Sequence, residues 1–415
     1  MRSVIWLVLL FVVAVVAATT LGTNDGLVTL YWGGWRTDLS LNLFVILVLG
    51  SCFVIMFAAQ ALNSLVSLPR RAEEWRALRK ERAAQAALRE ALVESYGARY
   101  GRARKAAQKA LAIQADAPGL GGDAEFRLLG QMLVASSLHK LQDRARRDDV
   151  VQQALKGSRV GGSTRPADEA VRMLAAEWAL DDRDATRALA LLAELPPGAA
   201  RRSHALRLKL QACRMAQQPL EALHTARLLA NHQAFSPVVA QTLLRSLACD
   251  TLEGAHDLQQ LRRLWGQFDV TDRRDAQVAS RAALRAAHLG AHEDARAWLR
   301  PFWDRLSELS REDRDQVALA FISAGTGISG DWLPRLESAL NAHGQEPAVV
   351  AAVANAYAQR QLWGKARRLL EQAAAAPSLP ARNRRAAWRQ LAKLARQETD
   401  EARAAACEQA AAAID

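Results

Sequence analysis

Three glycines, Gly325, Gly327 and Gly330, form the string GTGISG. In dinucleotide-binding proteins this spacing lets a loop approach a pyrophosphate, but only between a strand and a helix of one strand–helix–strand unit. The preceding residues, DRDQVALAFISA, instead have the composition and spacing of a helix. We therefore interpret the glycines as part of a turn between two helices, with Gly327 at the turn itself.

Metal or haem ligation is a second chemistry that the sequence could support. His288 and His292 are four residues apart, a spacing that could hold a metal ion on one helix, but Gly290 between them predicts a turn. A single His or Tyr could ligate a haem iron axially, yet no CxxCH motif is present to select a candidate. No cofactor is assigned, and haem or porphyrin stays open as a ligand.

No pattern in the chain predicts catalysis. The sequence has no serine-hydrolase elbow, P-loop or kinase signature. Neighbouring acids such as Asp148 and Asp149 lie in polar loops or helix starts, where carboxylates favour the helix dipole. The four cysteines are far apart and form no CxxC pair, which argues against a disulfide framework or zinc site and fits a reducing compartment. We expect no catalytic residue, metal ligand or enzyme activity.

Two apolar runs at the N-terminus predict a membrane anchor over residues 1–68. Residues 4–21 and 41–62 carry no charge, and each run is about 20 residues long, the length of a helix that crosses a hydrocarbon core. A cleaved signal peptide is the alternative for the first run. The segment RRAEEWRALRKER after the second run is basic, so the positive-inside rule places it in the cytoplasm. The short loop between the spans then lies outside.

That loop, LVTLYWGGWRTDLSL, has two β-like runs around Gly33 and Gly34, which predicts a β-hairpin. Tyr31, Trp32 and Trp35 are residue types that favour the membrane–water interface. The alternative is a small contact surface for a membrane partner.

The formal net charge is +12, and the positive excess is densest directly after the second run, with 12 Lys/Arg against 5 Glu between Arg70 and Lys109. Such a stretch is attracted to anionic lipid headgroups, and we prefer lipids to nucleic acid as its partner. Residues 69–98 are charged and expected to form a connecting helix. The candidates for lipid contact are Arg70, Arg71, Arg76, Arg79, Lys80 and Arg82.

Residues 99–411 are expected to form tetratricopeptide-like helical repeats. The clearest unit spans 34 residues, 347–380. It places small and large packing residues where such a repeat has them, at Ala354, Tyr357, Ala366, Leu370 and Ala373. Small residues let two antiparallel helices approach each other. Earlier units are looser, and chance similarity of Ala-rich helices is the alternative. The expected fold class is all-α, with two N-terminal transmembrane helices followed by a tetratricopeptide-like α-solenoid.

A solenoid presents a concave surface lined by the first helix of each pair. Such a groove could receive an extended segment or an acidic surface, and a solvated helix face is the alternative for each residue. The candidate partner-groove residues are His204, Arg207, Gln211, Arg214 and Asn355, the last through its side-chain amide.

The two spans, the short hairpin, the basic RRAEEWRALRKER segment and the repeats together resemble the proteobacterial HemY family. GLVTLYWGGWRTDLSLNLFVILVLG is similar to that family's hairpin and second span, and the half-repeat with Tyr100 and Ala103 follows. The resemblance covers essentially the whole chain. It implies a multi-pass protein of the bacterial inner membrane, with its repeats in the cytoplasm, associated with a late step of protohaem IX biosynthesis.

The resemblance further implies a scaffold or regulator that binds haem-biosynthesis enzymes. A haem- or porphyrin-binding carrier is one alternative, and an envelope-assembly scaffold unrelated to haem is another. The HemY name is also used for a flavin-dependent protoporphyrinogen oxidase, but this chain lacks the N-terminal strand, glycine loop and helix that FAD requires.

Overall fold

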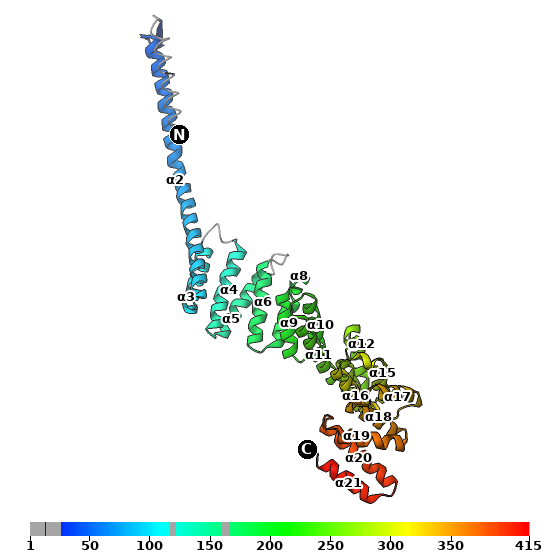
Figure 1. The fold of residues 1–415 in the computed structure, drawn as a ribbon. Coiled ribbons are helices and arrows are strands. Elements are labelled where there is room, and N and C mark those ends of the chain that lie inside the picture. The colour runs from blue at the N-terminus through cyan, green and yellow to red at the C-terminus, as the bar shows by residue number, and fades with distance from the viewer. Residues whose placement is uncertain (1–12, 14–25, 117–121, 159–165, 415) are drawn as a thin grey trace. The chain divides into compact units, whose positions relative to one another are not determined.

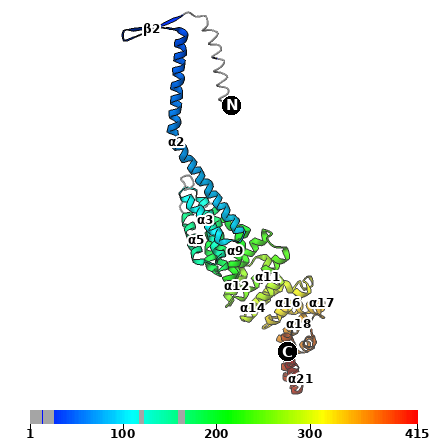
Figure 2. The same cartoon turned by 90° about the vertical axis from the view of Figure 1, so that its left-hand side faces the viewer.

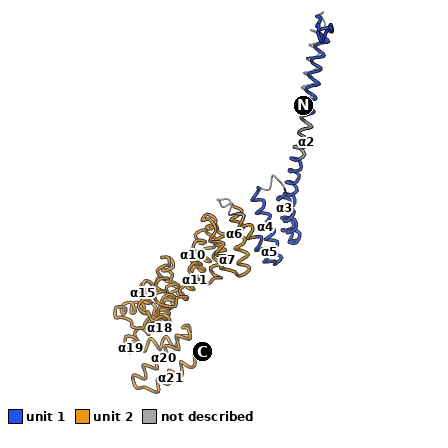
Figure 3. Tube along the Cα trace, turned by 180° about the vertical axis from the view of Figure 1, so that it is seen from behind, with its two compact units in different colours: residues 1–150 blue, residues 151–415 orange. Residues whose placement is uncertain are grey.

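The computed structural model describes Val13 and residues 26–116, 122–158 and 166–414, with the side chains of residues 63–72, 157 and 158 left undescribed. The chain divides into two compact units, residues 1–150 and 151–415, shown in two colours in Figure 3. Within the described residues every element except one β-hairpin is a helix (Figure 1). This agrees with the all-α prediction.

In the described part of unit 1, a β-hairpin precedes a long helix. Strand β1 (Leu27–Trp32) pairs antiparallel with β2 (Trp35–Ser40), and Trp32 lies opposite Trp35. The two turn residues, Gly33 and Gly34, have φ of +54° and +89°. Glycine adopts this left-handed conformation without steric cost, and consecutive left-handed residues match the twist of the strands. The predicted hairpin is confirmed.

A single helix, α2 (Leu41–Tyr96), follows the hairpin. It begins at Ser40, whose Oγ accepts a hydrogen bond of 3.3 Å from the backbone N–H of Leu43. Its first part, Leu41–Leu62, is long and apolar enough to cross a membrane, with a mean hydropathy of 2.6. This agrees with the second expected span, whereas the first, residues 4–21, lies outside the described residues except for Val13. The span and most of the expected connecting helix, residues 69–98, form one continuous helix.

The charged part of α2 packs through alanines. Ala84, Ala87 and Ala91 are buried on one side of α2, which contacts α3 and α4. Because alanine adds little bulk, helix axes can approach closely at such positions. The remaining helices of this part are α3 (Tyr100–Ala115), α4 (Ala124–Lys140) and α5 (Arg144–Ser158), the last of which crosses the boundary at residue 150.

Unit 2 is a succession of helices, most of which contact the next helix along the chain (Figures 1 and 2). Contacts also join alternate helices, such as α14 with α16 and α16 with α18. The elements are α6 (Pro166–Asp181), α7 (Ala185–Ala193), α8 (Pro197–Ala200), α9 (Ser203–Met215), α10 (Pro219–Asn231), α11 (Pro237–Glu253), α12 (Leu258–Gln267), α13 (Val270–Arg273), α14 (Ala276–His288), α15 (His292–Trp303), η2 (Leu306–Glu308), α16 (Arg311–Ala324), η3 (Gly330–Trp332), α17 (Leu333–His343), α18 (Pro347–Gln359), α19 (Trp363–Ala375), α20 (Ala381–Gln397) and α21 (Glu401–Ala412).

The core of unit 2 consists mainly of alanine and leucine. Ala354, Ala366 and Ala373 are fully buried, and Tyr357 and Leu370 are 2% exposed. These five positions are the small and large packing residues expected in the 347–380 unit. Their burial confirms which side of each helix faces the core.

Several turns between helices use one residue in the left-handed conformation. After most of these residues the next backbone N–H bonds a carbonyl five residues back, as from Leu362 to Tyr357 at 2.9 Å and from Asp184 to Ala179 at 2.8 Å. This bond satisfies an otherwise unpaired carbonyl at the helix end. The left-handed turn residues in unit 2 are Arg183, Gln217, Gln233, Gly290, Gly327, Gln361 and Thr399.

Several side-chain bonds between helices of unit 2 join residues about 30 positions apart in the sequence. Arg285 donates to the carbonyl of Ala255, 30 residues away, and Arg403 bonds Glu371, 32 residues away. These separations are close to the 34 residues of the expected repeat unit.

Candidate partner-binding surface

Helix α9 has one exposed polar face. His204, Arg207, Gln211 and Arg214 are all exposed, and their spacing of three or four residues places them along one side of the helix. None of these four side chains makes a hydrogen bond or ion pair with another residue in the described part of the chain. The face is therefore available to a partner.

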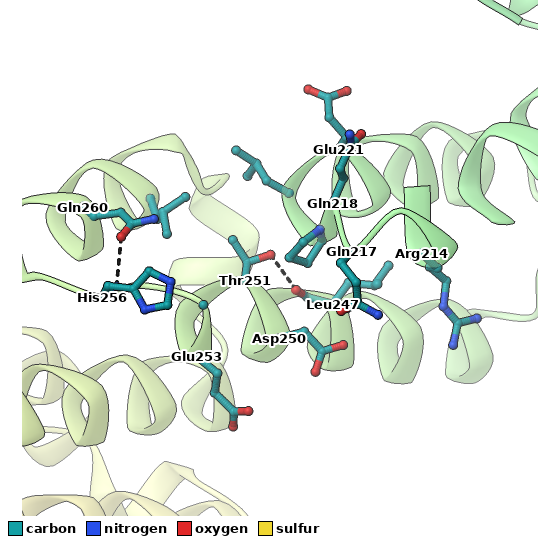
Figure 4. Close-up of a pocket in the computed structure, with 14 residues that line it drawn as sticks. Arg214, Gln217, Gln218, Glu221, Leu247, Asp250, Thr251, Glu253, His256 and Gln260 are labelled. Carbon is teal, nitrogen blue, oxygen red and sulfur yellow. Dashed lines mark hydrogen bonds between the residues drawn. The ribbon is translucent and has the colours of Figure 1, made fainter. Parts of the chain in front are cut away.

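The C-terminal end of this face opens on a hollow of about 740 Å³ that is lined by both polar and apolar residues. Figure 4 shows Arg214 and Gln217 on one side of the hollow and His256 and Gln260 on the other. Its wall comes from the ends of α9 and α11 and the starts of α10 and α12. The lining residues are Arg214, Gln217, Gln218, Pro219, Leu220, Glu221, Leu247, Asp250, Thr251, Glu253, Gly254, His256, Gln260 and Leu264.

The hollow combines acidic acceptors with one basic donor. Glu221 lies 3.7 Å from the ammonium of Lys209, and Glu253 lies 3.2 Å from the guanidinium of Arg281, so both carboxylates are partly neutralised. Asp250 and Arg214 have no ion-pair partner among the described residues. A polypeptide that offers both amide groups and charged side chains would find complementary groups here.

Polar groups at the base of the hollow are held by local hydrogen bonds. The hydroxyl of Thr251 donates to the carbonyl of Leu247 at 2.7 Å. The side-chain oxygen of Gln260 accepts from the backbone N–H of His256 at 2.9 Å. These bonds fix the backbone, while the imidazole of the exposed His256 faces the hollow (Figure 4).

Unlike the four exposed side chains of α9, the side chain of Asn355 is hydrogen-bonded to neighbouring helices. Its Nδ2 donates to the carbonyl of Ile322 on α16 at 2.8 Å, and its Oδ1 accepts from Nε2 of Gln390 on α20 at 3.0 Å. The half-buried amide on α18 thus links this helix to α16 and α20. Asn355 does not line the 740 Å³ hollow, and its expected hold on a partner peptide stays a prediction.

The GTGISG string lies where α16 ends, and Gly327 has a φ of +67°, which confirms the turn interpretation. Arg296 is 8% exposed and donates to the carbonyls of Ala324 and Thr326, both at 2.7 Å, and of Gly327 at 3.4 Å. A phosphate-binding loop presents N–H groups to its anion. This loop instead presents carbonyls to a guanidinium, an arrangement that sequence spacing did not indicate.

The histidine pair and the cysteines show no metal-site geometry. His292 Nδ1 lies 3.1 Å from the carbonyl of Ser323, whereas His288 is exposed at the end of α14. Over the described ranges no three His, Cys, Asp or Glu side chains gather where they could hold a metal ion. Burial raises the pKa of the Cys213, Cys249 and Cys407 thiols, which keeps them protonated and weakly nucleophilic.

The hairpin, the apolar helix and the helical body define an all-α protein that is compatible with a membrane location. Residues 26–121 match the family model for the HemY protein N-terminus. The chain therefore carries a HemY N-terminal domain, which confirms the family resemblance over the hairpin, α2 and α3 and links the protein to haem biosynthesis. The residues that match this family model make up less than a quarter of the chain. A search of curated proteins found none that matches the chain.

Proposed function

We propose that this protein is an inner-membrane scaffold or regulator for a late step of protohaem IX biosynthesis, and that it acts without catalysis. In this proposal two N-terminal spans anchor a tetratricopeptide-like solenoid in the cytoplasm, where it binds haem-biosynthesis enzymes. The HemY N-terminal domain supports the process, and the apolar Leu41–Leu62 helix supports the anchor. The recurring turns and the bonds between residues about 30 apart support the repeat stack.

One observation carries the binding role. The exposed face of α9 runs from His204 to Arg214 and ends at the 740 Å³ hollow, so a polar strip and a recess are continuous. Helical-repeat proteins bind extended segments along such surfaces, and an adjoining recess can select one side chain of the segment.

Site-specific photocrosslinking in membranes tests this role. A photoreactive amino acid at Gln211, on the exposed face of α9, should give a discrete adduct with a haem-biosynthesis enzyme. The matched control is Leu228 on α10, which is 48% exposed and does not line the hollow. Identical adducts from both positions would contradict a specific surface. Adducts with envelope-assembly proteins alone would support the scaffold unrelated to haem.

A haem or porphyrin carrier is the second candidate, because the hollow is lined by exposed His256 and also by the apolar side chains of Leu220 and Leu264. An imidazole beside apolar side chains could hold a haem iron axially. Titration of the full chain with haem should then give a Soret shift that His256→Ala removes and that His288→Ala leaves unchanged. A titration curve identical to that of free haem would reject the carrier.

A further inference from the structure

The hairpin has two chemically different faces. Directly opposed residues of an antiparallel pair point to the same side of the ribbon, and successive residues alternate. The register therefore sorts the side chains into two sets. One set, here the Trp face, consists of Val28, Leu30, Trp32, Trp35, Thr37 and Leu39; the other, the Arg face, consists of Leu27, Thr29, Tyr31, Arg36, Asp38 and Ser40.

The Arg face is internally satisfied and suited to water. The guanidinium of Arg36 lies 5.9 Å from the ring centre of Tyr31, and its Nε donates to Oδ1 of Asp38 at 3.3 Å. These contacts tie a cation, an anion and an aromatic ring together on one side of the ribbon.

Within the described part of the chain, the Trp face is mostly exposed, and only Val28 and Leu39 at its base are half-buried. Trp32 is 88% exposed, Trp35 is 81% exposed and Leu30 is 43% exposed. A lone two-stranded ribbon is marginal in water, because it has one apolar face and nothing to bury it against. A stable hairpin at this position needs an apolar phase against its Trp face.

The attachment of the hairpin to α2 indicates that this apolar phase is the bilayer. Strand β2 ends at Ser40, which also caps the apolar helix, and the N–H of Leu41 donates to the carbonyl of Gly26 at 2.8 Å. Both ends of the ribbon are therefore held at the first residue of the candidate span. The hairpin lies crosswise to the start of α2 in Figure 2. A ribbon that lies across the end of a membrane-crossing helix lies along the membrane surface.

We propose that the Trp face rests on the boundary between headgroups and acyl chains of the bilayer, with phospholipid as its occupant, and that the Arg face is in water. The two paired Trp rings place their apolar parts toward the acyl chains and their indole N–H groups among the headgroups. The hairpin then lies along the membrane surface at the start of α2 and limits how far α2 enters the bilayer.

Two threonines on opposite faces of the hairpin give a matched test. Thr37 belongs to the Trp face and Thr29 to the Arg face, and both lie in the middle of their strands. Thr37→Cys and Thr29→Cys are made in the full chain with Cys52, Cys213, Cys249 and Cys407 replaced by Ala, and each is labelled with a nitroxide. The proteins are placed in phosphatidylethanolamine–phosphatidylglycerol vesicles, and collisions with oxygen and with a water-soluble nickel chelate are measured.

The label at residue 37 should collide mainly with oxygen, which concentrates in lipid, and the label at residue 29 mainly with the nickel chelate. A residue 37 label that is open to the chelate would place the Trp face in water and overturn the proposal. A residue 37 label shielded from both reagents would show a protein cover, from a second copy or another partner, and would overturn it equally.

A second measurement avoids labels and cysteine replacement. In vesicles with lipids brominated near the headgroup, tryptophan fluorescence of the unaltered chain is compared with that of the Trp32→Phe/Trp35→Phe variant. The variant should lose a blue-shifted, bromine-quenched component. If the quenched fraction is the same in both proteins, the two rings do not contact lipid.

Discussion

The guanidinium of Arg314 at the start of α16 binds both oxygens of the Glu346 carboxylate, 32 residues further along the chain. Nε donates to Oε2 at 3.1 Å and Nη2 donates to Oε1 at 2.9 Å. The two side chains are 15% and 19% exposed, so this forked pair is well shielded from water. Such geometry is stronger and more specific than a surface ion pair.

Glu346→Gln should therefore destabilise unit 2. The amide keeps the shape of the carboxylate but loses its charge and one acceptor, and hydrogen bonds to charged groups are each worth about 1.5–3 kcal/mol. The measurement is the free energy of unfolding of the full chain in detergent micelles by chemical denaturation. Glu337→Gln, which disrupts the exposed pair with Lys365, is the control and should change stability by less than about 1 kcal/mol. If Glu346→Gln and Glu337→Gln lose the same stability, shielding from water does not strengthen the Arg314–Glu346 pair.

The same pair predicts how stability depends on pH. Burial by itself would raise the pKa of Glu346, but the hydrogen bonds and charge of Arg314, with a contribution from His343, hold that pKa below its ordinary value. A carboxyl with a lowered pKa stabilises the folded state above its unfolded pKa, and this stabilisation is lost as pH falls through the folded pKa. The stability difference between the unaltered chain and Glu346→Gln should shrink on acidification. A difference that is constant from neutral to acidic pH would show that the carboxylate charge has no role.

Arg296 is predicted to hold the turn that contains Gly327. Arg296→Met preserves much of the apolar stem but leaves the carbonyls of Ala324 and Thr326 without their donor, at a cost of about 1.5–3 kcal/mol. Arg300 is on the same helix, is 52% exposed at its side chain and lies 3.9 Å from Asp304, so Arg300→Met should change stability by less than about 0.5 kcal/mol. Denaturation of both variants checks this contrast. If the two variants are equally stable, the carbonyl bonds contribute nothing.

Substitutions at two left-handed turn residues should change the stability of the protein in opposite directions. Gly290 has a φ of +80° and its Cβ position is open, so Gly290→Ala should destabilise through backbone strain alone, by about 1–2 kcal/mol. Gln361 has a φ of +59°, and Gln361→Gly relieves the same strain, partly offset by the greater freedom of glycine in the unfolded chain. The unfolding midpoint of Gly290→Ala should be lower than that of the unaltered chain. The midpoint of Gln361→Gly should be equal to that of the unaltered chain or higher. The reverse order would contradict the turn geometry.

Basic side chains on α2 are predicted to attract anionic lipid. Arg76, Arg79, Lys80 and Arg82 are exposed, while the side chains of Arg70 and Arg71 lie outside the described set. Each basic residue near a negatively charged surface contributes about 1 kcal/mol. Replacing the four exposed residues by Gln should reduce the preference for spin-labelled phosphatidylglycerol over phosphatidylcholine around the full chain. Arg382→Gln with Arg389→Gln, on exposed positions of α20, should leave that preference unchanged, and salt should weaken it in the unaltered protein.

Local signals in the sequence determined much of the architecture. A charge-free run predicts the Leu41–Leu62 helix, and two adjacent glycines predict the hairpin, because both depend on neighbouring residues alone. The spacing of Ala354, Tyr357 and Leu370 likewise indicated the buried sides of α18 and α19, since the pitch of a helix converts spacing into a face. The two prolines and the glycine of residues 195–200, LPPGAA, indicate a loop, but this segment contains the short helix α8, because Pro197 suits the first turn of a helix.

Side-chain contacts between residues about 30 positions apart in the sequence depend on the tertiary structure and could not be predicted from the sequence. Sequence spacing placed Asn355 on a groove-facing position, but packing brings Ile322 and Gln390 to its amide. The hollow beside Arg214 exists only where the ends of α9 and α11 meet the starts of α10 and α12, and the carbonyls held by Arg296 converge only in the folded turn. Helix formation depends on contacts three or four residues apart, whereas these sites depend on how whole helices pack against one another.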